Sequence, residues 1–201
     1  MINELQKINR ELENIQKSII SYLENKRKSF PRFYFVSNDD LIEILSKSKD
    51  FDNIQQHLPK IFENIKTLEM NNIELIESMQ SQEGEVIKFV RPDQLGDNIN
   101  ETLKKIETCM VNTVKQIIKT GINKLQNETE SRNEWLFRHS AQVIVTCDAI
   151  QWTESTGLCL SNEDPIEEML VWSDTLKIQL DEVINLVRGN LSEVHRKTLT
   201  S

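Results

Sequence analysis

Residues that interrupt regular structure are scarce along the whole chain. Only five glycines and four prolines occur in 201 residues, so long stretches contain neither of the residues that end helices. This scarcity favours helices over a fold of many short strands joined by tight turns. The glycine-rich loops with which nucleotide-binding folds hold phosphate are also missing, because neither G-x-x-x-x-G-K-[ST] nor G-x-G-x-x-G occurs in the sequence.

Apolar residues recur at helical spacing through most of the chain. The first helix is predicted to run from the N-terminus to the basic residues 26–28, which suit the C-terminal end of a helix dipole, and Pro31 then closes it. Its apolar residues alternate at steps of three and four, as in a coiled-coil seam: Leu5, Ile8, Leu12, Ile15, Ile19 and Tyr22. Capping residues and apolar spacing predict further helices at 38–45, 58–69, 98–121 and 131–152, and a short element at 51–56. The helix at 131–152 is expected to be the most buried one. A final unbroken helix is predicted at 165–201.

Residues 73–90 carry the only strand-like pattern in the sequence. Two β-prone runs, 73–79 and 86–90, flank a glycine-containing turn. The sequence therefore predicts a mainly all-α fold, an elongated multi-helix bundle with one β-hairpin inserted around residues 73–90. We take residues 1–201 as a single helical segment that divides into N-terminal helices at 1–70, the hairpin at 71–95 and C-terminal helices at 96–201.

Charge and motif content argue against several classes of function. The chain has 24 Lys and Arg against 32 Asp and Glu and a formal charge of −8, so nucleic acid is not an expected partner. Neither an apolar leader nor a long apolar run is present, so no membrane partner and a cytoplasmic location are expected. The three cysteines form no C-x-x-C, and the three histidines occur in no E-x-x-H or H-E-x-x-H. We therefore predict no catalytic, cofactor-binding or metal-binding residues in this segment.

Two groups of residues could have a catalytic or binding role as well as a structural one. His139 and Cys147 could share a helical neighbourhood as a nucleophilic pair, but a histidine on a polar face and a cysteine in the core is the favoured interpretation. The basic and aromatic run 26–35 has the composition of a surface that stacks on bases. The acidic balance of the chain instead favours a connector whose rings pin a loop onto helix ends.

Several ordered motifs resemble the linker region of dynein heavy chains. The first is the stretch 22–45, and it is followed by the run 57–65, by Ser81-Gln-Glu-Gly-Glu85 and by motifs near residues 134–153 and 186–189. The resemblance covers nearly the whole chain and is somewhat greater to axonemal heavy chains than to the cytoplasmic one. The residues that carry the family signature are Phe30, Pro31, Arg32, Phe33, Tyr34, Phe35, Glu83, Gly84, Trp135, Gln142, Trp152, Arg188 and Gly189.

The resemblance implies that the chain is a piece of a much larger heavy chain, in which it forms a mechanical lever and carries out no catalysis. The lever would lie across the AAA+ ring of the same chain, where ATP and Mg²⁺ act, and would turn ring rearrangements into force along microtubules. The implied partners of the parent are microtubules and the dynein intermediate and light chains. The implied location is the cytoskeleton, with the axoneme of a cilium or flagellum slightly favoured.

The same resemblance suggests where the lever would bend and where it would meet the ring. The expected bending points are residues 29–36 and turns around Gly96 and Gly157. The hairpin is expected to project exposed polar residues toward the ring, among them Glu83 and Glu85.

The residues also admit a function of another class. A free-standing cytosolic helical adaptor would bind partner helices through the Leu5–Tyr22 seam. The adaptor predicts self-association or a helical ligand for that seam, whereas the lever segment predicts a monomer.

Overall fold

The computed structural model describes residues 1–47, 50–127 and 131–200, which form two compact units. Unit 1 comprises residues 1–82 and 91–109, and unit 2 comprises residues 83–90 and 110–201. Both units therefore join part of the predicted hairpin segment to helices.

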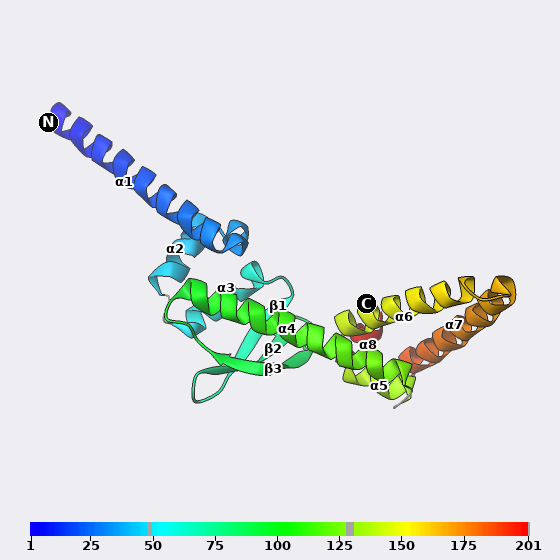
Figure 1. Cartoon of the computed structure of the whole chain (residues 1–201). Helices are drawn as coiled ribbons and strands as arrows, with labels where there is room; N and C mark the ends of the chain where they lie inside the picture. The colour runs from blue at the N-terminus through cyan, green and yellow to red at the C-terminus, as the bar shows by residue number, and fades with distance from the viewer. Residues whose placement is uncertain (48–49, 128–130, 201) are drawn as a thin grey trace. The chain divides into compact units, whose positions relative to one another are not determined.

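Helices make up most of the described structure (Figure 1). Unit 1 contains α1 (Ile2–Ser29), the 3-10 helix η1 (Pro31–Phe35), α2 (Asn38–Ser46), α3 (Phe51–Ile61), β1 (Ile65–Met70) and β2 (Leu75–Ser81). Unit 2 contains α5 (Arg132–Arg138), α6 (Ala141–Leu160), α7 (Pro165–Arg188) and α8 (Glu193–Thr200). Two elements, β3 (Val86–Gln94) and α4 (Ile99–Gln126), contribute residues to both units. The mainly α-helical fold with inserted strands is confirmed, and its elongation stays a prediction.

Polar side chains begin four helices at the predicted places. In each case the side-chain oxygen accepts a hydrogen bond from the backbone N–H three residues later, which satisfies one donor that a helix start leaves without a partner. The four capping residues are Ser37, Asn98, Ser131 and Asp164.

The three strands form one sheet in the order β1-β2-β3. β1 and β2 are antiparallel, with Leu68 opposite Met79. Asn71 builds the turn between them, because its Oδ1 accepts hydrogen bonds from the N–H groups of Ile73 and Leu75 at 3.0 Å each. The predicted hairpin is therefore part of a larger sheet that includes β1 as a further strand.

The helix predicted at residues 58–69 is wrong. α3 ends at Ile61, having absorbed the short element predicted at 51–56, and the chain then turns into β1. Asn64 has a positive φ of 65°, a conformation that asparagine tolerates better than most residues. The side chain of Gln55 on α3 then hydrogen-bonds both the N–H and the C=O of Leu68, at 2.9 Å each. The strand is thus fixed by a tertiary contact that apolar spacing does not reveal.

The predicted segment 131–152 is interrupted in the structure. It divides into α5 and α6 at residues 139–140, where Ser140 has an extended backbone. Trp152 is half exposed, so the segment is also less buried than predicted. Gly157 lies inside α6, and the turn expected there is therefore wrong.

The unbroken helix predicted at 165–201 is also wrong, because α7 ends at Arg188 and α8 begins at Glu193. The guanidinium of Arg196 on α8 donates hydrogen bonds to the carbonyls of Val187 and Gly189. These bonds satisfy acceptors that the end of a helix leaves without backbone partners. The break is therefore stabilised from the following helix.

Each unit has its own buried core. The largest fully buried side chains of unit 1 are Phe30, Phe33, Leu23, Leu41, Ile44, Ile54, Leu58, Ile61, Leu68, Leu103 and Ile106. In unit 2 a cluster of buried residues is formed by Trp135, Leu136, Val143, Ile144 and Cys147.

Candidate functional site

The connector, residues 29–36, joins α1 to α2 within unit 1. Pro31 takes the first position of η1, where its fixed φ suits the helix and its missing N–H is not needed. The rings of Phe30 and Phe33 are buried and meet edge-to-face with centroids 5.1 Å apart, and Phe30 also lies 6.4 Å from the ring of Phe62. These rings therefore pack inside the unit and are not available to stack on bases.

Arg27 holds the connector from the last turn of α1. Its guanidinium donates to the carbonyl of Phe33 at 3.3 Å, to the carbonyl of Val36 at 3.1 Å and to Oδ1 of Asn38 at 2.8 Å. It also donates to Oε1 of Glu24 at 3.2 Å. The side chain is only 12% exposed, so these charge-assisted bonds form where water competes little. The middle and the C-terminal end of η1 are thereby fixed to α1.

Arg32 ties the connector to two other elements of unit 1. Its Nε donates to Oε1 of Glu107 on α4 at 2.7 Å, and its guanidinium lies 5.0 Å from the ring centroid of Phe62. A further contact of 3.5 Å joins its Nη1 to the carbonyl of Ile61 at the end of α3. We name Arg27, Arg32 and these partners the connector clamp.

Tyr34 and Phe35 are the exposed part of the connector. The Tyr34 ring lies 6.0 Å from the Arg27 guanidinium, and its hydroxyl donates to Oε2 of Glu24 at 3.5 Å. Phe35 is 75% exposed. These two side chains are the aromatic residues of the connector that a partner can reach.

Two carboxylates of α2 bind basic residues near α3. Lys60 approaches Asp40 at 2.7 Å, and this hydrogen bond, assisted by Ser37, holds the pKa of the Asp40 carboxyl below its ordinary value. Lys47 and then Asn53 hydrogen-bond Glu43 and lower the pKa of that carboxyl as well. Both acids favour their charged form, so α2 and α3 are linked electrostatically.

The turn before β3 is fixed to the C-terminal part of unit 2. Gly84 has a φ of 95°, which only glycine adopts without strain. Oε1 of Glu85 accepts hydrogen bonds from the backbone N–H of Ala141 at 3.1 Å and from the hydroxyl of Thr198 at 2.5 Å. The Glu85 carboxylate thus caps the start of α6 and holds α8, which corrects the expectation that it projects toward a partner. Glu83 is exposed, as expected.

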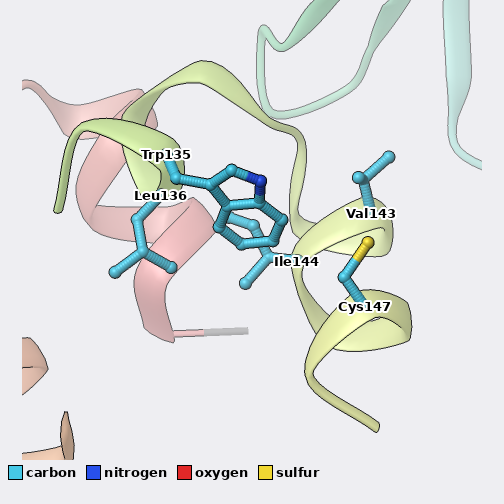
Figure 2. Packing of buried hydrophobic residues seen from close by; sticks show 5 residues of the cluster. All are labelled: Trp135, Leu136, Val143, Ile144 and Cys147. Carbon is cyan, nitrogen blue, oxygen red and sulfur yellow. The ribbon is translucent and has the colours of Figure 1, made fainter. Parts of the chain in front are cut away.

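Trp135 forms the centre of the buried cluster in unit 2 (Figure 2). Its side chain is completely buried, and its indole N–H donates to the carbonyl of Gly121 at 3.2 Å. The indole also stacks on the ring of His139 with centroids 4.6 Å apart. This signature residue therefore joins α5 to α4 and to the start of α6.

The structure supports the core interpretation of Cys147, which is fully buried, and places His139 half-buried against the Trp135 ring and not on a polar face. Both side chains lie against Gly121, but each is engaged elsewhere: Nδ1 of His139 lies 2.8 Å from the carbonyl of Trp135, and the Cys147 thiol donates to the carbonyl of Ile118 at 3.7 Å. Burial raises the pKa of the Cys147 thiol, which disfavours the thiolate that a nucleophile needs.

The remaining signature residues lie mainly at the surface of unit 2. Gln142 and Arg188 are exposed, and Trp152 is half exposed. Gly189 follows the last residue of α7 with extended backbone, and its N–H bonds back to the carbonyls of Asn185 and Leu186. Their family role stays a prediction.

Sequence reasoning missed three residues that hold these sites: Arg27, Glu107 and Thr198. Arg27 was recognisable only as one of several basic residues at a helix end. Glu107 is 75 residues from Arg32, and Thr198 is 113 residues from Glu85. Such pairs have no local signal in a single sequence.

The part of the chain that the structure describes contains no group of three or more His, Cys, Asp or Glu placed to hold a metal ion. Among the same residues, no helix is both long enough and apolar enough to cross a membrane.

Comparison with known proteins assigns the family. Residues 1–121 match the family described as dynein heavy chain, N-terminal region 2. This chain belongs to the dynein heavy chain family. The matched residues include all of unit 1, with its connector, and the turn before β3.

Individual dynein heavy chains are similar over nearly the whole chain. This chain is 37% identical over 202 residues to dynein axonemal heavy chain 3 of Mus musculus. It is 35% identical over 203 residues to dynein axonemal heavy chain 12 of Homo sapiens. Both alignments cover 99% of this chain. It is 32% identical over 208 residues, 100% of this chain, to the dynein-1-beta heavy chain of the flagellar inner arm I1 complex of Chlamydomonas reinhardtii. The dynein resemblance and its axonemal preference are thereby confirmed. The chain spans only 5% or 6% of the length of these heavy chains.

Proposed function

We propose that this dynein heavy chain segment is a mechanical lever that transmits ATP-driven ring rearrangements as force along microtubules. The observation that carries the proposal is the connector clamp, because Arg27 and Arg32 bond the joint between α1 and α2, which contains η1, to α1, α3 and α4. The proposal therefore treats residues 29–36 as a stiff joint and not as the bending point expected from the resemblance. A lever must transmit a displacement rather than absorb it, and a loose joint at this place would absorb it.

The clamp is suited to this role by its geometry. Arg27 binds two backbone carbonyls of the connector, and Arg32 joins the connector to α3 and α4. Hydrogen bonds to a charged group contribute about 1.5–3 kcal/mol each when they are protected from water. The Arg27 bonds are protected in this way, because that side chain is only 12% exposed, whereas Arg32 and Glu107 are 40% and 35% exposed and contribute less. The Arg27 bonds make bending at η1 costly compared with the few kcal/mol of a typical conformational change.

The test is a charge swap across the clamp in the complete motor. Arg32→Glu should lower the velocity of microtubule gliding while ATP turnover is retained, because force transmission and not catalysis is affected. The double variant Arg32→Glu with Glu107→Arg rebuilds an ion pair and should recover most of the velocity. Lys28→Met, at an exposed position in the same turn of α1 as Arg27, is the matched control and should leave velocity unchanged.

Two results would contradict the lever. One is a gliding velocity that stays at the wild-type value when the ion pair is broken. The other is a loss of ATP turnover in proportion to velocity, since that would place this segment in the catalytic machinery.

The wider setting of the lever is part of the same proposal. The AAA+ ring of the same heavy chain would bind ATP and Mg²⁺, and microtubules and the dynein intermediate and light chains would be partners of the parent motor. The names of the similar proteins suggest an axoneme as the location. On the hairpin, Glu83 remains the candidate contact with the ring, because Glu85 is already bound within unit 2.

An adaptor remains a second candidate because the α1 seam is uncovered in unit 1. All six seam residues are exposed, from Leu5 to Tyr22. Sedimentation of the 201-residue chain distinguishes the two functions. Self-association that Leu12→Glu abolishes and Lys17→Glu retains would favour the adaptor, and a monomer over the micromolar range would count against it.

A further inference from the structure

α6 and α7 pack against each other as a helical hairpin (Figure 1), and this hairpin exposes many large apolar side chains. A surface helix normally buries one stripe of apolar residues and exposes a polar face. In α7 none of the 24 residues is buried. The large apolar side chains of this hairpin that face solvent are Val145, Trp152, Leu158, Leu160, Ile166, Leu170, Val171, Ile178, Leu180 and Ile184. So many exposed large apolar side chains on two neighbouring helices indicate a site of packing against another element.

The same hairpin is strongly acidic. Residues 141–188 contain nine Asp and Glu but only two basic residues, Lys177 and Arg188, a formal charge of −7. Lys177 is paired with Asp174 at 2.8 Å. A partner that covers this surface therefore needs apolar side chains on one face and basic side chains beside them.

A hollow of about 280 Å³ lies within this surface, between α6 and α7. It is lined by Arg132, Asp148, Trp152, Trp172, Leu176 and Gln179, among others. Arg132 donates to both carboxylate oxygens of Asp148, at 3.0 and 3.1 Å, but its Nε is buried without an acceptor. The indole Nε1 of Trp172 is also buried without an acceptor. Both nitrogens are inaccessible from outside, so they do not select what enters the hollow. The hollow offers room for a side chain beside Trp152, Trp172 and Leu176.

We propose that a basic amphipathic helix from the remainder of the same heavy chain covers the α6–α7 hairpin and places an apolar side chain in the hollow lined by Trp152 and Trp172. The charge and the apolar residues define the chemistry of the occupant. The source follows from length, because this chain spans about one twentieth of the heavy chains it matches, 5% of the first. A helix in the same polypeptide is held at a high effective concentration, which favours it over a separate protein. The proposal does not depend on the lever function.

The test uses the complete heavy chain with a photo-reactive residue. Leu170 is 64% exposed on α7, and replacing it with p-benzoylphenylalanine places a cross-linker among the exposed apolar residues of the hairpin. After irradiation, mass spectrometry should identify a cross-link to a peptide of the same heavy chain outside residues 1–201, within a segment that has basic residues and helical apolar spacing. The matched control carries the same group at Lys119, an exposed polar position on α4, and should give at most one fifth of that yield.

A second pair of variants tests the charge complementarity. Asp181→Lys with Glu182→Lys should reduce the yield at Leu170 at least fivefold, whereas Glu4→Lys with Glu11→Lys on α1 should leave it unchanged. Cross-linking to a different polypeptide, a yield no higher than that at Lys119, or a yield that is indifferent to the α7 charges would each overturn the proposal. Circular dichroism of each variant confirms that the helical content is retained.

Discussion

The replacement of Trp135 tests most directly whether one cluster holds unit 2 together. The indole is completely buried and bonds the Gly121 carbonyl at 3.2 Å. A buried tryptophan removes about 200 Å² from water, which at about 25 cal/mol per Å² corresponds to about 5 kcal/mol. Trp135→Ala should therefore lower the free energy of unfolding by about 3–5 kcal/mol, since the site relaxes only partly around the cavity. Trp135→Phe keeps most of the ring and loses one hydrogen bond, so it should cost about 2 kcal/mol.

The assay is urea unfolding of the 201-residue chain, followed by circular dichroism because Trp135 itself would contribute to a fluorescence signal. Leu158→Ala is the control, since Leu158 is 73% exposed on α6, and it should change the free energy by less than about 0.5 kcal/mol. If Trp135→Ala costs no more than Leu158→Ala, or if the alanine and phenylalanine variants are equally destabilised, the assignment of Trp135 as the centre of the cluster is refuted.

Three further predictions concern other parts of the fold. Arg27→Met should lower the free energy of unfolding, measured in urea titrations, by about 2–4 kcal/mol, because it leaves the connector carbonyls without their charged donor. A loss below about 0.5 kcal/mol would contradict the connector clamp. Gly84→Ala should lower the stability by about 1–2 kcal/mol, because alanine is strained at the positive φ of this residue. Gly157→Ala inside α6 has open space around the new Cβ and should raise the stability by about 0.5–1 kcal/mol. Equal effects of the two variants in thermal melts would show that the positive φ of Gly84 is misassigned. Asp40 and Glu43 have lowered pKa values in the folded state, so their contribution is present above the ordinary values of 3.8 and 4.5 and is lost as pH falls through the folded pKa values. The double variant Asp40→Asn with Glu43→Gln should therefore flatten the acid limb of a stability-versus-pH curve, and an unchanged limb would contradict the shifts.

Helix starts were predictable because their signals are local. Ser37, Asn98, Ser131 and Asp164 each act within three residues of their own position, so a single sequence contains both partners of the capping bond. The same holds for the turn at Gly84. The dynein signature was recognisable for a related reason, since an ordered series of short motifs needs no knowledge of the contacts that the residues make.

The wrong assignments share a physical cause. Apolar residues at 58–69 have helical spacing, but Gln55 hydrogen-bonds both backbone groups of Leu68 and holds that residue in a strand. In the C-terminal part, Arg196 stabilises the end of α7 at Gly189, where apolar spacing predicts that the helix continues. In both places a side chain from another element competes with the helical hydrogen bonds and decides the backbone conformation.

The residues of the candidate site were predictable from the sequence, but the contacts that fix the connector to the rest of unit 1 were not. Phe33 and Phe35 were expected to pin a loop; Phe33 is buried and does so, whereas Phe35 is 75% exposed. The other bonds that hold the connector come from Arg27 and from the distant partner Glu107. Glu85 is a second case in which distant partners were not predictable. A carboxylate in a polar turn suggests an exposed contact, but this one already accepts hydrogen bonds from Thr198 and from the first N–H of α6. A charge reversal at Glu85 would therefore perturb unit 2 itself, and the exposed Glu83 is the better position at which to test a partner of this hairpin.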